Sequence, residues 1–259
     1  MTPYLARIDL YPIKSLDGVT VESAIVLPGG ALKHDRTYAL HDQAGKFING
    51  KRYASIHRVR SQFSEDFSSV TLQTQGTNTE QTFHLLREQP ALVKWLSAYF
   101  QQPVTLQVNP EQGFPDDTDS SGPTIISTGT LQQVATWFEL SLEETRRRFR
   151  TNLEIGGVPP FWEDKLFAET GEPVDFQIGE ISVGGINPCQ RCVVPTRDAL
   201  TGETIPAFQK RFVQKRAATL PPGVARSRFN HFYRLAVNTR ISPAMAGKVL
   251  RVGDGLSCV

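Results

Sequence analysis

Apolar and polar residues alternate along most of the first hundred residues, in the pattern of half-buried β-strands. The alternation runs through MTPYLARIDLYPI, VTVESAIVL, TYALHDQAGKFI and VTLQTQGTNTEQTFHLL. The last two segments predict hairpins, and the first of these turns between Asp42 and Gly45. A short amphipathic helix at ALVKWLSAYF follows them. This part of the chain is therefore predicted to be rich in β-structure.

Residues 109–123, NPEQGFPDDTDSSGP, interrupt this pattern with a polar run rich in Pro, Gly and Asp. Such a run is typical of a domain boundary or of a long ordered loop. We place the boundary after residue 112, which divides the chain into an N-terminal module, 1–112, and a second domain, 113–259.

Strand and helix patterns are mixed in the second domain. The apolar run TIIS precedes TGTLQQVATWF, whose apolar side chains have the spacing of one helix face. A second helix is predicted to begin at Ser141, because Glu144 three residues on completes a capping box. VDFQIGEISVGG predicts a hairpin that turns at Gly179–Glu180. PAFQKRFVQKRA predicts a helix with Pro206 near its first turn, and KVLRVGDGLSCV predicts a return to strand. The predicted fold class is mainly β with a few short helices.

Composition and charge narrow the class of protein. Of the 259 residues 39% are hydrophobic and 21% charged, which is ordinary for a globular protein, and the net charge of +2 gives no global attraction to nucleic acid or membranes. No stretch reaches membrane-span length, and the start lacks the apolar core of a signal peptide. Three cysteines indicate a reducing, cytoplasmic location and are too few for an iron–sulfur cluster.

Two of the cysteines, Cys189 and Cys192, lie three residues apart in NPCQRCVVPTRDALTGE. Half of a zinc site, a redox disulfide and a buried apolar pair are all open interpretations of this spacing. The segment CVVPTRD is β-branched and is predicted to be strand-like, which disfavours the helix N-terminus of thioredoxin-like chemistry. Arg191 between the cysteines favours a thiolate and an oxyanion ligand, and a thiolate is a good ligand for soft transition metals.

Hydroxyl groups lie between an apolar strand and a helix start in TIISTGTLQQV. Ser127 and Thr128 could bind a phosphate there, but capping of the helix is the interpretation that the residues themselves favour.

Cationic residues suited to an anion occur in two further places. Among the arginines of EETRRRFRTN, Arg150 is the one we expect in a site, together with Asn152, because the helix gives way to extended chain there. Lys14 and Ser15 follow a strand-breaking YP, and Arg36 lies in KHDRTY. Each of these is an ordinary surface residue when taken alone.

Together these segments resemble the MOSC-domain proteins, and among them the mitochondrial amidoxime-reducing component and its bacterial homologues. The resemblance rests on YPIKS, HDRTYAL with GKFING, GFPDD, ISTGTL, RFRTN with EDKL, and NPCQRCVVPTRDALTG, in that order. It covers nearly the whole chain, and the Cys-x-Arg-Cys segment with its following Thr-x-Asp-x-x-Thr-Gly is the most specific part. It implies an N-terminal MOSC β-barrel module followed by the MOSC domain, itself a β-barrel.

The resemblance also implies a molybdenum cofactor (Mo-molybdopterin) and residues that hold it. Cys192 would be the catalytic thiolate on the metal, and Arg191 and Gln190 would contact the cofactor. Lys14, Ser15 and Arg36 would reach it from the N-terminal module, Ser127 and Thr128 would lie near its phosphate, and Arg150 and Asn152 would lie on the pterin side. Cys189 would be a neighbour and not a ligand. Pyridoxal phosphate binding is implied only at the level of the wider family.

The implied activity is the reduction of small N-hydroxylated compounds, with electrons from a separate flavin or iron–sulfur protein. The alternatives are a non-catalytic carrier of the cofactor or of persulfide sulfur, both using Cys192, and a β-rich binding module with structural zinc. The chain departs from the family where Phe232 or Tyr233 stands near an expected tyrosine, and where EDKL replaces the usual Ser–Trp continuation after Glu–Asp. We expect neither a nucleic-acid partner nor a membrane partner.

Overall fold

The largest sheet joins the two ends of the chain in the computed structural model, which describes residues 2–258. Its eight strands lie in the order β15-β11-β12-β13-β9-β10-β1-β2. Their bounds are Tyr4–Leu10 (β1), Val19–Val21 (β2), Ile125–Ser127 (β9), Leu153–Gly156 (β10), Val174–Ile178 (β11), Ile181–Gln190 (β12), Arg234–Ile241 (β13) and Leu256–Cys258 (β15). Because β1 pairs with β10, this sheet crosses the boundary at residue 112, which stays a prediction.

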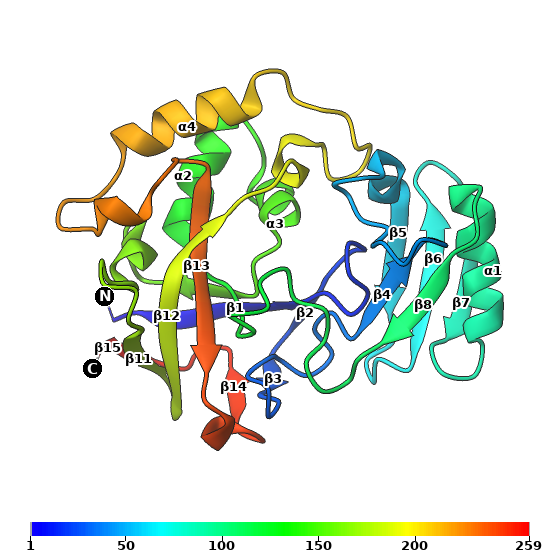
Figure 1. Cartoon of the computed structure of the whole chain (residues 1–259), viewed down its shortest axis with the longest axis horizontal. Helices are drawn as coiled ribbons and strands as arrows, with labels where there is room; N and C mark the ends of the chain where they lie inside the picture. The colour runs from blue at the N-terminus through cyan, green and yellow to red at the C-terminus, as the bar shows by residue number, and fades with distance from the viewer. Residues whose placement is uncertain (1, 259) are drawn as a thin grey trace.

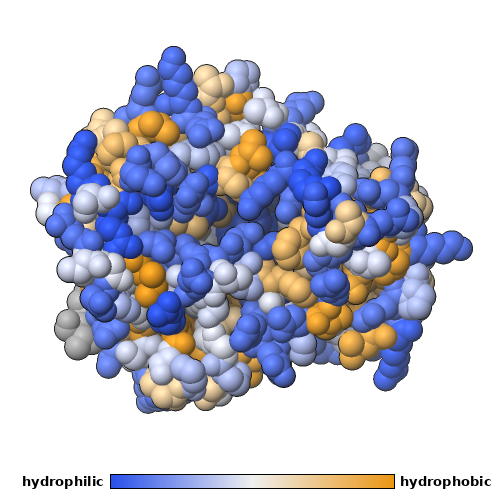
Figure 2. Space-filling model, viewed as in Figure 1, coloured by the Kyte–Doolittle hydropathy of each residue, from blue (hydrophilic) through white to orange (hydrophobic). Residues whose placement is uncertain are grey.

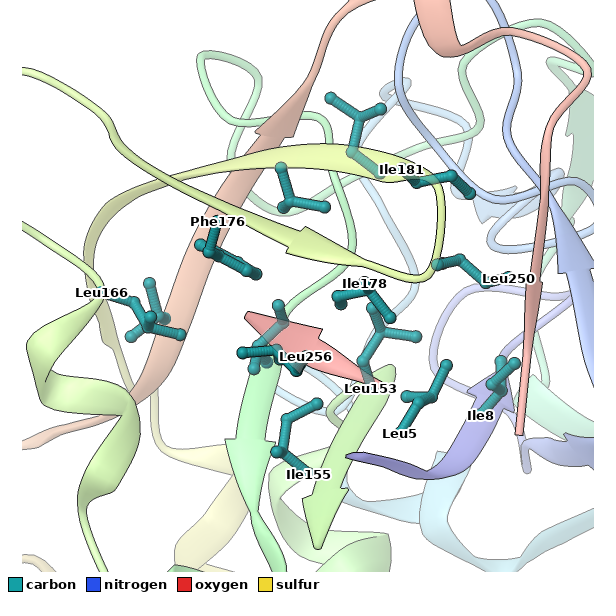
Figure 3. Packing of buried hydrophobic residues seen from close by; sticks show 14 of the residues in the cluster. Leu5, Ile8, Leu153, Ile155, Leu166, Phe176, Ile178, Ile181, Leu250 and Leu256 are labelled. Carbon is teal, nitrogen blue, oxygen red and sulfur yellow. The ribbon is translucent and has the colours of Figure 1, made fainter. Parts of the chain in front are cut away.

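The main core packs against this sheet (Figure 3). Leu5 and Ile8 of β1, Leu153 of β10, and Phe176 and Ile178 of β11 are fully buried and converge on one another. Phe176 and Ile178 are two residues apart, as an alternating pattern predicts. Leu5 and Ile8 are three apart, because the register of β1 shifts between Leu5 and Arg7. The hairpin predicted at Gly179–Glu180 is confirmed, since β11 and β12 pair directly on either side of that turn.

Smaller sheets occupy the other side of the molecule (Figure 1). They are formed by β5 (Val59–Phe63), β6 (Ser69–Thr74) and β7 (Glu80–His84), and by β4 (Tyr38–His41) paired with β8 (Thr105–Val108). Helix α1 (Gln89–Phe100) packs on them over a second core that includes Val70, Leu72, Phe83, Leu92 and Leu96. The second predicted hairpin, β6 with β7, and the predicted helix are therefore confirmed. The first is only a turn after Asp42 with an isolated bridge between His41 and Phe47, because the strand partner of β4 is β8.

The third core lies beneath three helices of the second half. They are α2 (Thr128–Phe138), α3 (Leu142–Phe149) and α4 (Phe208–Ala218), with Val134, Phe138, Phe149, Phe208 and Phe212 in contact. The predicted start of α3 is confirmed, because Ser141 Oγ accepts a hydrogen bond of 3.0 Å from the Glu144 N–H. Short 3-10 turns occur at Ala54–Arg58, Trp162–Lys165, Val194–Thr196, Arg226–Arg228 and Pro243–Met245.

Two local predictions were wrong. The segment VTVESAIVL is divided between β2 and β3 (Ser23–Ile25), and β3 pairs with β14 (Val249–Arg251) in a separate two-stranded sheet. The segment after Cys192 is not strand: β12 ends at Gln190 and a 3-10 turn covers Val194–Thr196. Pro195 lacks the N–H that a strand ladder needs, which accounts for the break.

The molecule is mainly β, as predicted, and the polar run 109–123 is a loop without helix or strand between β8 and β9. Among the described residues, no helix combines the length and apolar character needed to span a bilayer.

Candidate functional site

A cavity of about 1310 Å³ opens between the main sheet and the smaller sheets. Residues from both halves of the chain line it, and the centre of the face in Figure 2 is mostly hydrophilic. Twelve Lys and Arg side chains line the cavity against six Asp and Glu, whereas the whole chain carries a net charge of only +2. The positive charge of the molecule is therefore gathered around this cavity, which favours an anionic ligand.

Cys189 and Cys192 both line the cavity and both are partly buried free thiols. The guanidinium of Arg191 donates a hydrogen bond of 3.2 Å to Cys189 Sγ, so its direct sulfur partner is Cys189. Burial lowers the pKa of Arg191, but the facing sulfurs of Cys189 and Cys192 outweigh it and leave the pKa raised. Arg191 therefore stays cationic beside Cys189 at the cavity wall.

The C-terminal end of α3 anchors two of the cavity's arginines. Arg191 donates to the carbonyl oxygen of Phe149, and Arg36 Nη2 lies 3.5 Å from the carbonyl oxygen of Arg150. These carbonyls are the free acceptors that a helix leaves at its end, where the helix dipole is negative. Two guanidinium groups from distant parts of the chain therefore meet at one helix terminus.

Arg150 itself points into the cavity without an acceptor. Its guanidinium carbon stacks 4.2 Å from the ring centre of Tyr11, and none of the described residues forms an ion pair or side-chain hydrogen bond with it. Burial and the nearby charge of Arg36 lower the pKa of Arg150. A partly buried cation that lies near another cation and has no acceptor is stabilised when a ligand supplies the negative charge.

Lys14 and Ser15 form the wall opposite α3. Lys14 Nζ donates hydrogen bonds of 2.8 Å to the carbonyl oxygen of Phe114 and to Asp116 Oδ1. Burial lowers the pKa of Lys14, and the carboxylate of Asp116 opposes that shift. Three of the cavity-lining residues have a left-handed backbone, with φ of 74° at Ser15, 50° at Arg36 and 51° at Arg150. Strain of this kind in non-glycine residues is concentrated at functional sites.

Asn152 lines the cavity, but its side-chain amide is already engaged. Its Oδ1 accepts from Arg36 Nη1 at 3.3 Å and from Thr124 Oγ1 at 3.2 Å, and its Nδ2 donates to the carbonyl of Asp9 at 3.1 Å. Within the described residues the amide therefore fixes the direction of Arg36. Gln190, at the end of β12, is exposed and also lines the cavity.

Ser127 and Thr128 do not line this cavity. Ser127 is fully buried and caps α2, accepting a 3.1 Å hydrogen bond from the Thr130 N–H, which confirms the capping interpretation. Thr128 Oγ1 donates to Glu154 at 2.7 Å and faces a shallow pocket elsewhere. Their expected contact with the cofactor phosphate stays a prediction.

The other three arginines of α3 differ in their contacts and exposure. Arg146 forms a two-pronged ion pair with Glu154, at 2.7 and 2.8 Å, which raises its pKa. Arg147 is exposed at the edge of the cavity. Arg148 is 98% buried and contacts the segment that follows Cys192.

Sequence reasoning missed several cavity residues of the N-terminal half. Tyr11 supplies the ring on which Arg150 stacks, and Asp116 pairs with Lys14. His57 lines the cavity with a buried Nε2 that has no partner among the described residues. Burial and the surrounding arginines, Arg150 foremost, lower the pKa of His57 to about 4, so it is neutral at pH 7. Asp116 lies in GFPDD and Tyr11 in YPIKS, two segments on which the family resemblance rests. Their contacts with Lys14 and Arg150 depend on the fold and could not be predicted from those segments.

The zinc alternative needs further ligands beside the two cysteines. Among the described residues no group of three or more His, Cys, Asp or Glu side chains is arranged to bind a metal, and the side chain of Cys258 lies outside what the structure describes. Neither Phe232 nor Tyr233 lines the cavity. Tyr233 is buried against Phe212, with ring centres 5.3 Å apart.

The chain belongs to the MOSC family. The MOSC N-terminal beta barrel domain matches residues 2–144, and the MOSC domain matches residues 120–256. Members of this family are associated with the molybdenum cofactor, and the resemblance noted in the sequence is thereby confirmed.

Among characterised relatives, the molybdenum cofactor sulfurases of Caenorhabditis briggsae and Caenorhabditis elegans are each 26% identical over 84 residues. The match covers 32% of this chain and 11% of each sulfurase, so it spans a small part of those proteins. A solved structure described as a hypothetical protein shares 13% identity, with a TM-score of 0.29 over 53% of this chain and 51% of its own.

Proposed function

We propose that this protein is a molybdenum-cofactor-dependent reductase of small N-hydroxylated compounds, such as amidoximes, N-hydroxylamines and N-hydroxylated bases. The observation that carries the proposal is the unpaired guanidinium of Arg150 in the same cavity as the thiol of Cys192. A ligand that satisfies both has an anionic part and a metal that accepts sulfur ligands.

The residues present fit such a cofactor. The sulfur of Cys192 would be the protein ligand of the metal, and Arg150, Arg36 and Arg191 would face its anionic groups. Lys14, Ser15 and Gln190 complete the wall, while Asn152 holds Arg36 in place. When bound, such a cofactor would supply the redox chemistry for removing the oxygen of an N–O bond, which consumes two electrons and two protons and releases water.

The chain's own residues would bind and orient the cofactor and neutralise its negative charge. The guanidinium groups fixed at the end of α3 are already in position, so little reorganisation accompanies binding. The cavity is large enough at about 1310 Å³ to admit a small substrate beside a cofactor. Because three cysteines cannot ligate an iron–sulfur cluster, the electrons would come from a separate flavin or iron–sulfur protein. We retain a cytoplasmic location as the expectation from the sparse cysteines.

Elemental analysis together with the fluorescence of released, oxidised pterin tests the proposal. Protein expressed in a host that makes the cofactor is expected to carry molybdenum and pterin in equal amounts. Protein that carries zinc in place of molybdenum, or no pterin, would contradict it.

Persulfide carriage is the second candidate, and the similarity to the sulfurases favours it. In that role Cys192 would hold a sulfane sulfur in the same cationic cavity. Cyanide releases such a sulfur as thiocyanate, whereas a molybdenum-bound thiolate yields none. A stoichiometric release that disappears in Cys192→Ala, with no turnover of N-hydroxylated compounds by the wild-type protein, would support this candidate.

A further inference from the structure

One buried ion pair on α3 holds the loop that begins at Cys192. Arg148 is 98% buried, and its Nε donates a hydrogen bond of 2.7 Å to Glu144 Oε1, one helical turn earlier. Residues 192–203 are here called the cysteine loop. They carry Cys192 at one end and run past this ion pair before the chain continues toward α4.

The ion pair contacts the cysteine loop at three successive points. Arg148 Nη1 donates to the carbonyl oxygen of Pro195 at 3.2 Å, and Nη2 lies 3.5 Å from Asp198 Oδ2. Glu144 Oε1 accepts the N–H of Ala199 at 3.1 Å. The first contact lies three residues beyond Cys192, so the tether to the thiol is short.

The loop is also braced from the N-terminal module. Arg60 Nη2 donates to the carbonyl oxygen of Ala199 at 3.3 Å, which places a hydrogen bond on each side of that residue. Within the loop, Asp198 Oδ1 accepts the N–H groups of Leu200 and Thr201, at 3.0 and 2.8 Å. The loop therefore carries its own turn, and α3 fixes the orientation of that turn.

We propose that Arg148 and Glu144 are positioning residues that fix the direction of the Cys192 sulfur in the cavity. Neither residue was assigned a role in the cofactor site, and Glu144 occupies the position where a capping box would turn its carboxylate back to the helix start. That carboxylate is instead committed to Arg148 and Ala199. The pair acts through the loop, and its importance for catalysis rests on the proposed function.

A buried arginine that donates in three directions is hard to replace. Lysine keeps the charge of Arg148 but cannot reach Glu144, Pro195 and Asp198 together. Each carbonyl or carboxylate left without its donor favours local opening of the loop. Opening changes the exposure of Cys192 and leaves Cys189 in strand β12, between two residues that pair with β13.

The test measures the rate of alkylation of each thiol by iodoacetamide in the full chain, purified from a host that lacks the cofactor. Mass spectrometry of peptides reports Cys192 and Cys189 separately. Arg148→Lys and Glu144→Ala are expected to speed alkylation of Cys192 by about fivefold or more, with Cys189 changed less than about twofold. Glu144→Gln keeps an acceptor for the Ala199 N–H and is expected to restore most of the wild-type rate.

Arg216→Lys is the matched control. Arg216 is equally buried and pairs with Asp164, but none of its hydrogen bonds reaches the cysteine loop. It is expected to lower the melting temperature while leaving the ratio of the two alkylation rates unchanged. Equal changes at both thiols, an unchanged Cys192 rate in Arg148→Lys, or a changed ratio in Arg216→Lys would overturn the proposal. Because this readout needs no cofactor, it is independent of whether the reductase function holds.

Discussion

The guanidinium of Arg150 stacks 4.2 Å from the ring centre of Tyr11, and no described residue gives it an acceptor. Arg150 also adopts a left-handed backbone at the C-cap of α3, with φ of 51°. The protein thus accepts both a strained backbone and an unpaired cation at one position. Strained or unpaired groups of this kind are retained where a bound ligand compensates for the stability that they lose.

Arg150→Met is therefore expected to separate stability from binding. Without the cofactor the variant should unfold at the same temperature as the wild type or higher, because a partly buried, unpaired charge near Arg36 is removed. Cofactor occupancy should fall by roughly tenfold or more, the worth of a charge-assisted hydrogen bond. Melting temperature and molybdenum content, measured on the same preparations, check both. A variant that is less stable yet fully loaded would contradict this account of Arg150.

Gly202→Ala tests how the cysteine loop meets the N-terminal module. Gly202 has φ of +79°, and an added Cβ would lie 2.5 Å from the carbonyl oxygen of Ala54. Gly76→Ala is the control, because its φ of +84° is similar and nothing lies within 4 Å of the added atom.

The control is expected to lose about 1 kcal/mol of unfolding free energy from backbone strain alone. Gly202→Ala should lose about 2 kcal/mol more than the control, since a backbone atom must move to relieve the overlap. Urea unfolding of both variants measures the difference. Equal losses would show that the contact with Ala54 is unimportant.

Glu163→Gln should stabilise the protein in alkaline solution. Burial, with the nearby charge of Asp164, raises the pKa of Glu163 to about 7, although the hydroxyls of Thr130 and Ser127 beside it act in the opposite direction. A raised pKa means that this group's stabilising contribution is complete below its unfolded value of 4.5 and is lost as pH rises through about 7.

Glutamine has nearly the shape of glutamate but does not ionise, so the variant does not lose stability in this way as the pH rises. It is expected to gain about 2 kcal/mol over the wild type at pH 8.5, and much less at pH 5. Denaturant unfolding at the two pH values measures this, with the exposed Glu65→Gln as a control. A gain that does not depend on pH would show that Glu163 is not protonated in the folded state at low pH.

Much of the fold could be predicted from the spacing of apolar residues alone. Leu131, Val134 and Phe138 repeat at helical spacing and are buried in α2, as expected. The local chemistry of Ser141 likewise marked the start of α3. Such features depend on neighbours within a turn or two, which a sequence displays directly. The register of β1 against β10 depends on residues about 150 positions apart, and no local pattern contains it.

The candidate site was predicted through the family resemblance more than through physics. Eight of its ten predicted residues line the cavity: Lys14, Ser15, Arg36, Arg150, Asn152, Gln190, Arg191 and Cys192. Their cofactor contacts stay predictions. Ser127 lies outside the cavity, and its hydroxyl caps the start of α2. The hydrogen bond from Arg148 to the carbonyl of Pro195 could not be predicted. The sequence shows a run of similar arginines, and only the fold decides which of them is buried.

Reduction of benzamidoxime to benzamidine with an artificial electron donor tests the central claim most directly. Cofactor-loaded wild-type protein is expected to turn over, and Cys192→Ala is expected to lose nearly all activity. Cys189→Ala is expected to keep its molybdenum, because the proposed ligand of the metal is the other thiol, Cys192. Undiminished turnover by Cys192→Ala, or none by a fully loaded wild-type protein, would contradict the account.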